Sequence, residues 1–172
     1  MRESIGGAWL YGLVLSFTLF FVAFLIITIN YTRAFRVKNE VVDFIERNEG
    51  VTTGGGIGLS GTIPLINNYL IQSGYNVRGN CPTDDNWFGV TDMTRAGAIE
   101  PVNGNTTYFY CFRRDAVNDR VFYDIRVFFS FDLPILGTWM NLPVHGRTIE
   151  IGRPADCGEL WARWNEVPRC RR

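Results

Sequence analysis

The chain has 172 residues, of which 47% are hydrophobic and 15% aromatic, and its 17 basic side chains balance 17 acidic ones. This length is sufficient for one membrane helix and one small domain. Because no net positive charge remains to neutralise a phosphate backbone, we expect no nucleic-acid partner.

A charge-free apolar segment comes first in the chain, at residues 4–32, between Glu3 and Arg33. Its densest part, residues 8–29, has about 20 residues, the length at which an α-helix spans a hydrocarbon core. We therefore predict a single membrane-spanning helix, with membrane lipid as its partner. The alternative is a cleaved signal peptide, but such a peptide has a shorter apolar core and a small-residue cleavage site, which residues 29–32 lack.

The helix is expected to continue beyond the membrane to about residue 48, so that residues 1–50 form a transmembrane and extended N-terminal helix. Four apolar side chains recur at the spacing of one helix face: Val37, Val41, Phe44 and Ile45. We predict that this face packs on a sheet. Gly50 is placed to end the helix in a left-handed conformation.

Residues 51–61 are predicted to be a glycine-rich linker, and residues 62–172 an α+β domain. The domain should begin with a second helix at residues 62–73, capped by Thr62 and ended by Gly74. Its predicted buried face consists of Leu65, Ile66, Tyr69 and Leu70.

Aromatic and β-branched composition predicts strands at residues 106–113, 121–131 and 147–152, with weaker strand character at 87–90. Alternation in the second strand places five apolar side chains on the face that should meet the helix: Tyr123, Ile125, Val127, Phe129 and Phe131. Residues 115–118 are predicted as the preceding turn, and 134–143 as a broad connection to the last strand. The predicted fold class is α+β, with a long N-terminal helix packed on a small antiparallel sheet.

Four cysteines follow the apolar segment: Cys81, Cys111, Cys157 and Cys170. An even set is typical of two disulfides in an oxidising compartment, and the closely spaced pairs of a zinc site are missing. Of the three possible pairings we favour Cys81–Cys111 and Cys157–Cys170.

Two signals disagree about the side of the membrane on which the domain lies. The basic cluster of Arg33, Arg36 and Lys38 favours a cytoplasmic domain. The cysteines favour the opposite side. We follow the cysteines, because the basic residues belong to a mixed-charge helix, and predict a single-pass protein with an extracytoplasmic C-terminal domain at the cell surface.

Residues suited to catalysis are few. The single histidine, His145, lies in a predicted turn and has no catalytic motif around it. Asp84, Asp85 and Asp92 lie close in sequence, but Trp87 interrupts the alternating oxygen ligands of a calcium loop. We predict no catalytic residue, no metal site, no cofactor and no enzymatic activity.

The C-terminal segment contains Trp161 and Trp164 at the spacing of one helix face. One interpretation is that these rings pack beneath the Cys157–Cys170 bridge. The other is an exposed aromatic patch that binds a partner. The sequence leaves both interpretations open.

A long apolar N-terminal helix that continues into an amphipathic half and then a small antiparallel sheet resembles type IV pilin-like subunits. More narrowly, the chain resembles TadE-like pseudopilins of tight-adherence pilus systems. Three segments carry the resemblance: LVLSFTLFFVAFLIITINYTRAFRVKNEVVDFIERNEG, VFYDIRVFFSFDLPILG and RTIEI. It implies a structural subunit of a surface appendage or secretion assembly, whose partners are other pilin-like or platform subunits in a homo- or hetero-oligomer.

The sequence departs from type IV prepilins at the processing site, where a glycine is followed five positions later by glutamate. Here Tyr11 and Gly12 occupy the positions five residues after the two candidate glycines. Glu3 precedes both, and we hypothesise that it pairs with a neighbouring subunit's N-terminus. The predicted helix-assembly face consists of Glu3, Gly6, Gly7, Ala8 and Gly12, because small residues allow close helix approach; such residues are also common in any spanning helix.

The sequence thus predicts a non-enzymatic, membrane-anchored pilin-like subunit. The alternative is a single-pass anchored ectodomain that binds an extracellular ligand or partner protein. A tethered hydrolase would require His145 to act in catalysis.

Overall fold

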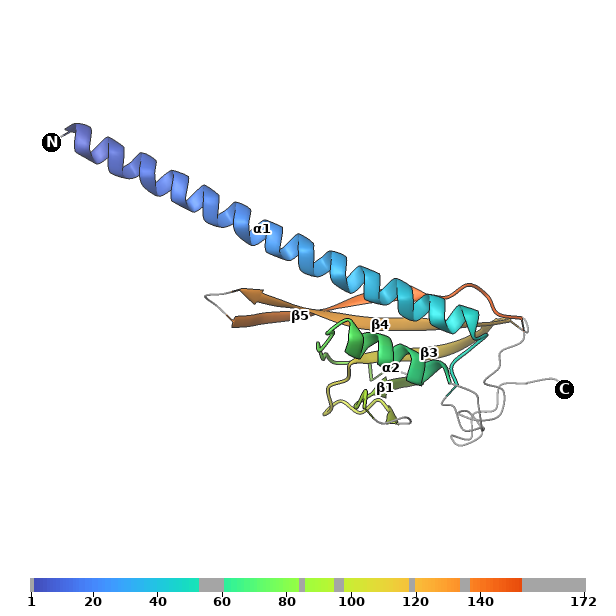
Figure 1. The fold of residues 1–172 in the computed structure, drawn as a ribbon. Helices are drawn as coiled ribbons and strands as arrows, with labels where there is room; N and C mark the ends of the chain where they lie inside the picture. The colour runs from blue at the N-terminus through green and yellow to red at the C-terminus, as the bar shows by residue number, and fades with distance from the viewer. Residues whose placement is uncertain are drawn as a thin grey trace.

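The computed structural model describes residues 2–52, 61–83, 86–94, 98–117, 120–133 and 137–152, with side chains from residue 7 onward except at 116–117, 131–133 and 137–140. The fold is α+β, as predicted (Figure 1). Two helices, α1 (Arg2–Arg47) and α2 (Thr62–Gln72), pack on a five-stranded antiparallel sheet of order β2-β1-β3-β4-β5. The strands are β1 (Trp87–Val90), β2 (Ile99–Pro101), β3 (Tyr110–Val117), β4 (Arg120–Leu133) and β5 (Gly137–Arg147).

The long helix α1 runs without interruption from the apolar segment into the domain, as the sequence predicts. It ends in a Schellman motif, in which the Gly50 N–H donates to the Ile45 carbonyl (2.9 Å) and the Glu49 N–H to the Glu46 carbonyl (3.2 Å). The prediction that Gly50 takes the left-handed position is wrong by one residue. Glu49 takes it, with φ 53°, and Gly50 follows with φ 141°.

Helix α2 begins one residue earlier than expected, because Gly61 rather than Thr62 is its N-cap. The Thr62 hydroxyl instead donates to the Gly50 carbonyl at 2.8 Å, which ties the start of α2 to the end of α1. Gly74 closes α2 with φ 63°, in the role predicted for it. The predicted linker at residues 51–61 lies mostly outside the described residues.

The β3–β4 hairpin is tighter than predicted, since Val117 pairs with Arg120 and only Asn118 and Asp119 lie between the strands. The prediction of a broad connection at residues 134–143 is wrong. β5 occupies most of that stretch, and Pro143 pairs with Phe128. Proline is compatible with this position because β5 is an edge strand. The strand predicted at 147–152 is reduced to one bridge between Val121 and Ile151.

The main core lies between the helices and one face of the sheet. Tyr123, Ile125, Val127 and Phe129 of β4 are all buried there, on the face that alternation predicts. A second, smaller cluster lies on the opposite face of the sheet: Cys81, Trp87, Tyr108, Cys111 and Phe128.

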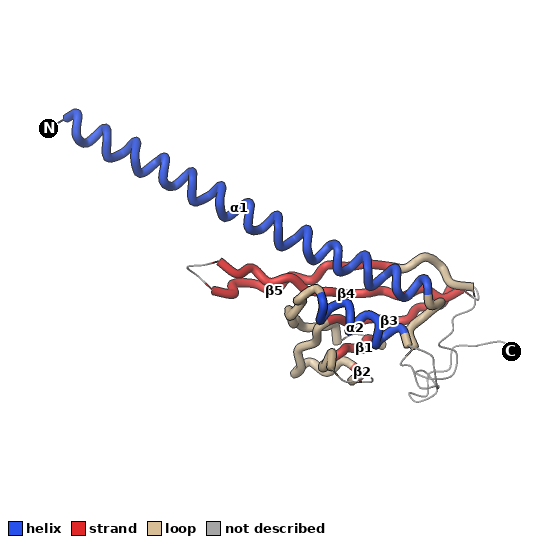
Figure 2. The backbone as a smooth tube through the Cα atoms, viewed as in Figure 1, coloured by secondary structure: helices blue, strands red, loops and turns tan. Residues whose placement is uncertain are grey.

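The ends of β4 and β5 form a two-stranded extension. Pairing between β3 and β4 stops at Tyr110 and Val127, whereas β4 continues to Leu133, paired with Gly137 of β5. This hairpin runs beside α1 toward the N-terminal end of the helix (Figure 2).

Candidate functional site: the exposed apolar helix

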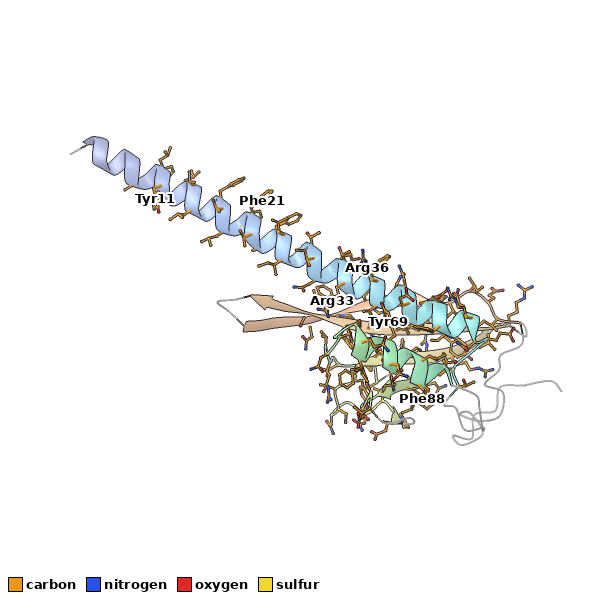
Figure 3. All side chains as sticks on the ribbon, viewed as in Figure 1. Tyr11, Phe21, Arg33, Arg36, Tyr69 and Phe88 are labelled. Carbon is orange, nitrogen blue, oxygen red and sulfur yellow. A yellow bond between two sulfur atoms is a disulfide. The ribbon has the colours of Figure 1, made fainter. Side chains whose placement is uncertain are left out.

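The most unusual surface of the molecule is the N-terminal part of α1. It is long and apolar enough to cross a membrane, and its most apolar window has a mean hydropathy of 2.6 with none of its residues buried. Large side chains project from it on every side, including Tyr11 and Phe21 (Figure 3). A helix that is apolar all round is typical of a nonaqueous environment or a helix assembly.

The polar side chains within this segment satisfy their own hydrogen bonds. The hydroxyls of Thr18, Thr28 and Thr32 each donate to the carbonyl oxygen four residues earlier, at 2.9, 2.9 and 2.8 Å. In lipid an unpaired hydroxyl is costly, whereas an internally bonded one is tolerated. These threonines are therefore compatible with a membrane span.

The junction between the apolar segment and the domain is fixed by Arg33, the first charged residue after the segment. Its guanidinium donates to the carbonyls of Ser73 (2.6 Å) and Gly74 (3.0 Å) at the C-terminus of α2. A cation there also complements the helix dipole. Arg36 lies on the opposite side of α1, away from the domain (Figure 3). Sequence reasoning used Arg33 only as a topology signal and missed this contact.

The predicted helix-on-sheet residues lie as follows. Val37, Val41 and Ile45 are buried in the main core. Phe44 is half-buried, and its ring contacts that of Tyr69 in α2 at 5.8 Å between centroids. The same face also contains Ala34, which is buried and was not predicted. The second half of α1 is thus covered by its own domain.

The predicted assembly residues lie at the other end of α1. Glu3 and Gly6 belong to the first turns, where only the backbone is described, and Gly7, Ala8 and Gly12 are exposed. A methyl group added at Gly7 or Gly12 would meet no described atom within 4 Å. Within the described part of the chain, these glycines therefore have no packing role. Ala8 and Gly12 are four residues apart on one face, the spacing at which small residues allow helices to approach closely.

Cys81 and Cys111 form the predicted pair, with Cα atoms 6.1 Å apart. The pair joins the segment after α2 to β3 and is buried in the smaller cluster. The other predicted pair, Cys157 and Cys170, lies outside the described residues, as do Trp161 and Trp164.

The outer face of the sheet has an open pocket of about 410 Å³, lined by Trp87, Arg113, Asp124, Arg126, His145, Gly146 and Arg147. Asp124 accepts hydrogen bonds from Arg113 (2.9 Å) and Arg147 (2.7 and 3.1 Å). Partial burial raises the pKa of Asp124, but the bonds from Arg147 and Arg113 outweigh it, so the pKa lies below its usual value. The carboxylate is therefore charged at neutral pH, and both of its oxygens are occupied.

His145 lies in β5, opposite Arg126, so the prediction of a turn is wrong. Partial burial and the charge of Arg126 lower the pKa of His145. Asp92 accepts hydrogen bonds from the N–H and hydroxyl of Thr94, whereas Asp84 and Asp85 lie outside the described residues. Across the ranges that the structure describes, no three His, Cys, Asp or Glu side chains are grouped to hold a metal ion.

Comparisons of the chain with protein-family models, curated proteins and solved structures find no match. Function must therefore be inferred from the two surfaces described above. The exposed helix is much the larger of them. The pocket on the sheet is shallow, and its Asp124 is occupied by arginine partners.

Proposed function

We propose that this protein is a non-enzymatic, membrane-anchored pilin-like subunit of a surface appendage or secretion assembly. One observation carries the proposal: the charge-free half of α1 is exposed all round, while the amphipathic half of the same helix is buried in its own domain. Apolar surface of that extent requires lipid or other helices around it, since water does not solvate it favourably.

The architecture supports the narrower resemblance to TadE-like pseudopilins. A long N-terminal apolar helix joined to a small antiparallel sheet is the arrangement that the resemblance implies. In such an assembly, each helix would exchange lipid contacts for contacts with neighbouring helices. Ala8 and Gly12 would allow close approach because neither contacts its own domain.

Two contacts support an extracytoplasmic domain. The Cys81–Cys111 pair is buried in the domain, and disulfides persist in oxidising compartments. Arg33, which would otherwise favour a cytoplasmic domain, binds the C-terminus of α2. Its position therefore has a structural reason that is independent of topology.

The proposal is tested by cysteine crosslinking in native membranes. Gly12→Cys is compared with Leu10→Cys, which lies on roughly the opposite side of α1 and is 67% exposed. Under mild oxidation we expect crosslinked oligomers from Gly12→Cys and far fewer from Leu10→Cys. Monomer alone at both positions would contradict assembly through this helix.

The second candidate function is an anchored ectodomain that binds an extracellular ligand or partner. The pocket beside Trp87, with Arg113, Arg126 and Arg147 around it, favours this alternative. Its prediction for the crosslinking experiment is the opposite one, a membrane-bound monomer at both cysteine positions.

A further inference from the structure

The β4–β5 extension lies level with the apolar segment of α1 rather than with its polar half. The ring of Phe129 in β4 packs edge-on against Tyr31, two residues before Arg33, at 5.8 Å between centroids. From Phe129 to Leu133, β4 advances toward the N-terminal end of α1 (Figure 1). At roughly 3.3 Å per strand residue this is about 13 Å, or about nine residues of α-helix. The backbone therefore passes the level at which α1 becomes charge-free.

The sequence of the extension matches that level. Between Phe128 and Leu142 the only charged residue is Asp132. The paired segments, residues 128–133 and 137–142, contain several large apolar residues: Phe128, Phe129, Phe131, Leu133, Trp139, Met140 and Leu142. Tryptophan is enriched where membranes meet water.

The hydrogen bonding of the extension limits how deep it can lie. Phe128 is the first β4 residue beyond β3, and the Tyr75 hydroxyl donates to its carbonyl (2.5 Å) and accepts from its N–H (2.9 Å). Past Phe128, that edge of β4 is paired with no described strand, and β5 is itself an edge. Open strand edges do not occur in the hydrocarbon region, so the extension suits the hydrated headgroup layer.

We propose that the end of the β4–β5 hairpin is a second membrane contact, seated in the headgroup layer of the leaflet from which α1 emerges. The inference rests on the proposed membrane anchoring, because the level of the hairpin is set by α1. Its partner is the lipid surface itself, since the extension continues beside the segment that lipid would surround. A neighbouring copy of the chain is the competing occupant that the experiment must distinguish.

The test is depth-dependent fluorescence quenching on the full chain in vesicles of phosphatidylcholine and phosphatidylglycerol. Single cysteines carrying an environment-sensitive dye are introduced as Trp139→Cys at the hairpin, Phe24→Cys in the apolar helix and Ile149→Cys beyond β5 at the other end of the sheet. Cys157→Ser and Cys170→Ser are included in all three variants. Each variant must retain the Cys81–Cys111 disulfide, which serves as the check on folding.

At position 139 we expect loss of fluorescence with lipids that carry a nitroxide near the headgroup, and less loss with a nitroxide deep in the acyl chain. Position 24 should be quenched by the deep nitroxide, and position 149 by neither. Quenching at 24 but not at 139 would overturn the hairpin contact and leave the anchoring intact. A blue-shifted but unquenched dye at 139 would indicate a protein neighbour and would also overturn it. No quenching at 24 would contradict the proposed function itself.

Discussion

The two halves of α1 differ in what surrounds them, although they form one helix. Ile29 is 68% exposed and Ile45 only 1%, and the difference lies in the pattern of their neighbours rather than in the residue. Around Ile29 the helix is apolar on all sides, so no single face selects the domain. Around Ile45 an apolar stripe alternates with charged residues, and the domain covers that stripe. Hydrophobicity thus determines the environment of the first half, and periodicity determines the contact of the second.

The largest expected effect comes from placing charges in the exposed half. Leu19→Arg combined with Leu25→Arg should cost about 5–7 kcal/mol of membrane insertion, at about 2.5–3.5 kcal/mol for each arginine near the centre of a span. We expect this variant to be released from membranes by alkaline carbonate. The matched control, Asn39→Arg with Glu40→Arg at exposed positions of the second half, should remain bound. Retention of the first variant would contradict a membrane role for α1.

The next effect compares the same truncation in both halves. Ile45→Ala should lower the free energy of unfolding by about 2–5 kcal/mol, because it leaves a cavity in the core. Ile29→Ala should change it by less than about 0.5 kcal/mol, since no domain residue covers Ile29. Denaturant unfolding in detergent micelles measures both. Equal losses would mean that the two halves are packed alike.

A smaller effect separates the halves by pH. The pKa of Asp124 is lowered in the folded domain, so its stabilising contribution is complete at neutral pH and is lost as the pH falls below about 4. Acid should therefore destabilise the domain, while the charge-free segment keeps its helicity. In Asp124→Asn this acid-dependent loss should shrink, at a cost of about 1 kcal/mol at pH 7. Parallel curves for both proteins in thermal unfolding would argue against the prediction.

The smallest effect concerns the point where α1 ends. Glu49→Gly should raise the free energy of unfolding by a few tenths to about 1 kcal/mol, because glycine adopts a positive φ without steric cost. Gly74→Ala, at the equivalent position after α2, is the matched opposite and should lower it by about 1 kcal/mol. Thermal unfolding of both variants in detergent provides the measurement. A gain from both substitutions would contradict the assignment of these two ends.

Regular hydrophobic patterns made most of this fold predictable. The apolar run and the stripe at Val37, Val41 and Ile45 located α1, and the alternation in β4 identified its buried face. β5 was missed because Pro143 and Gly137 suggest a connection, and only its edge position makes the proline acceptable. The contact of Arg33 with Ser73 and Gly74 was missed because it joins residues about 40 positions apart, and no local pattern records such a pairing.

The continuity of α1 has a mechanical consequence. The helix passes from its free part into the domain without a break, and Arg33 fastens it to α2 within the first turn after the charge-free segment. A pull on the sheet would therefore be transmitted along a stiff rod instead of being absorbed at a pliable joint. Leaning of the rod would swing the whole domain through the same angle, so each molecule would behave as a lever.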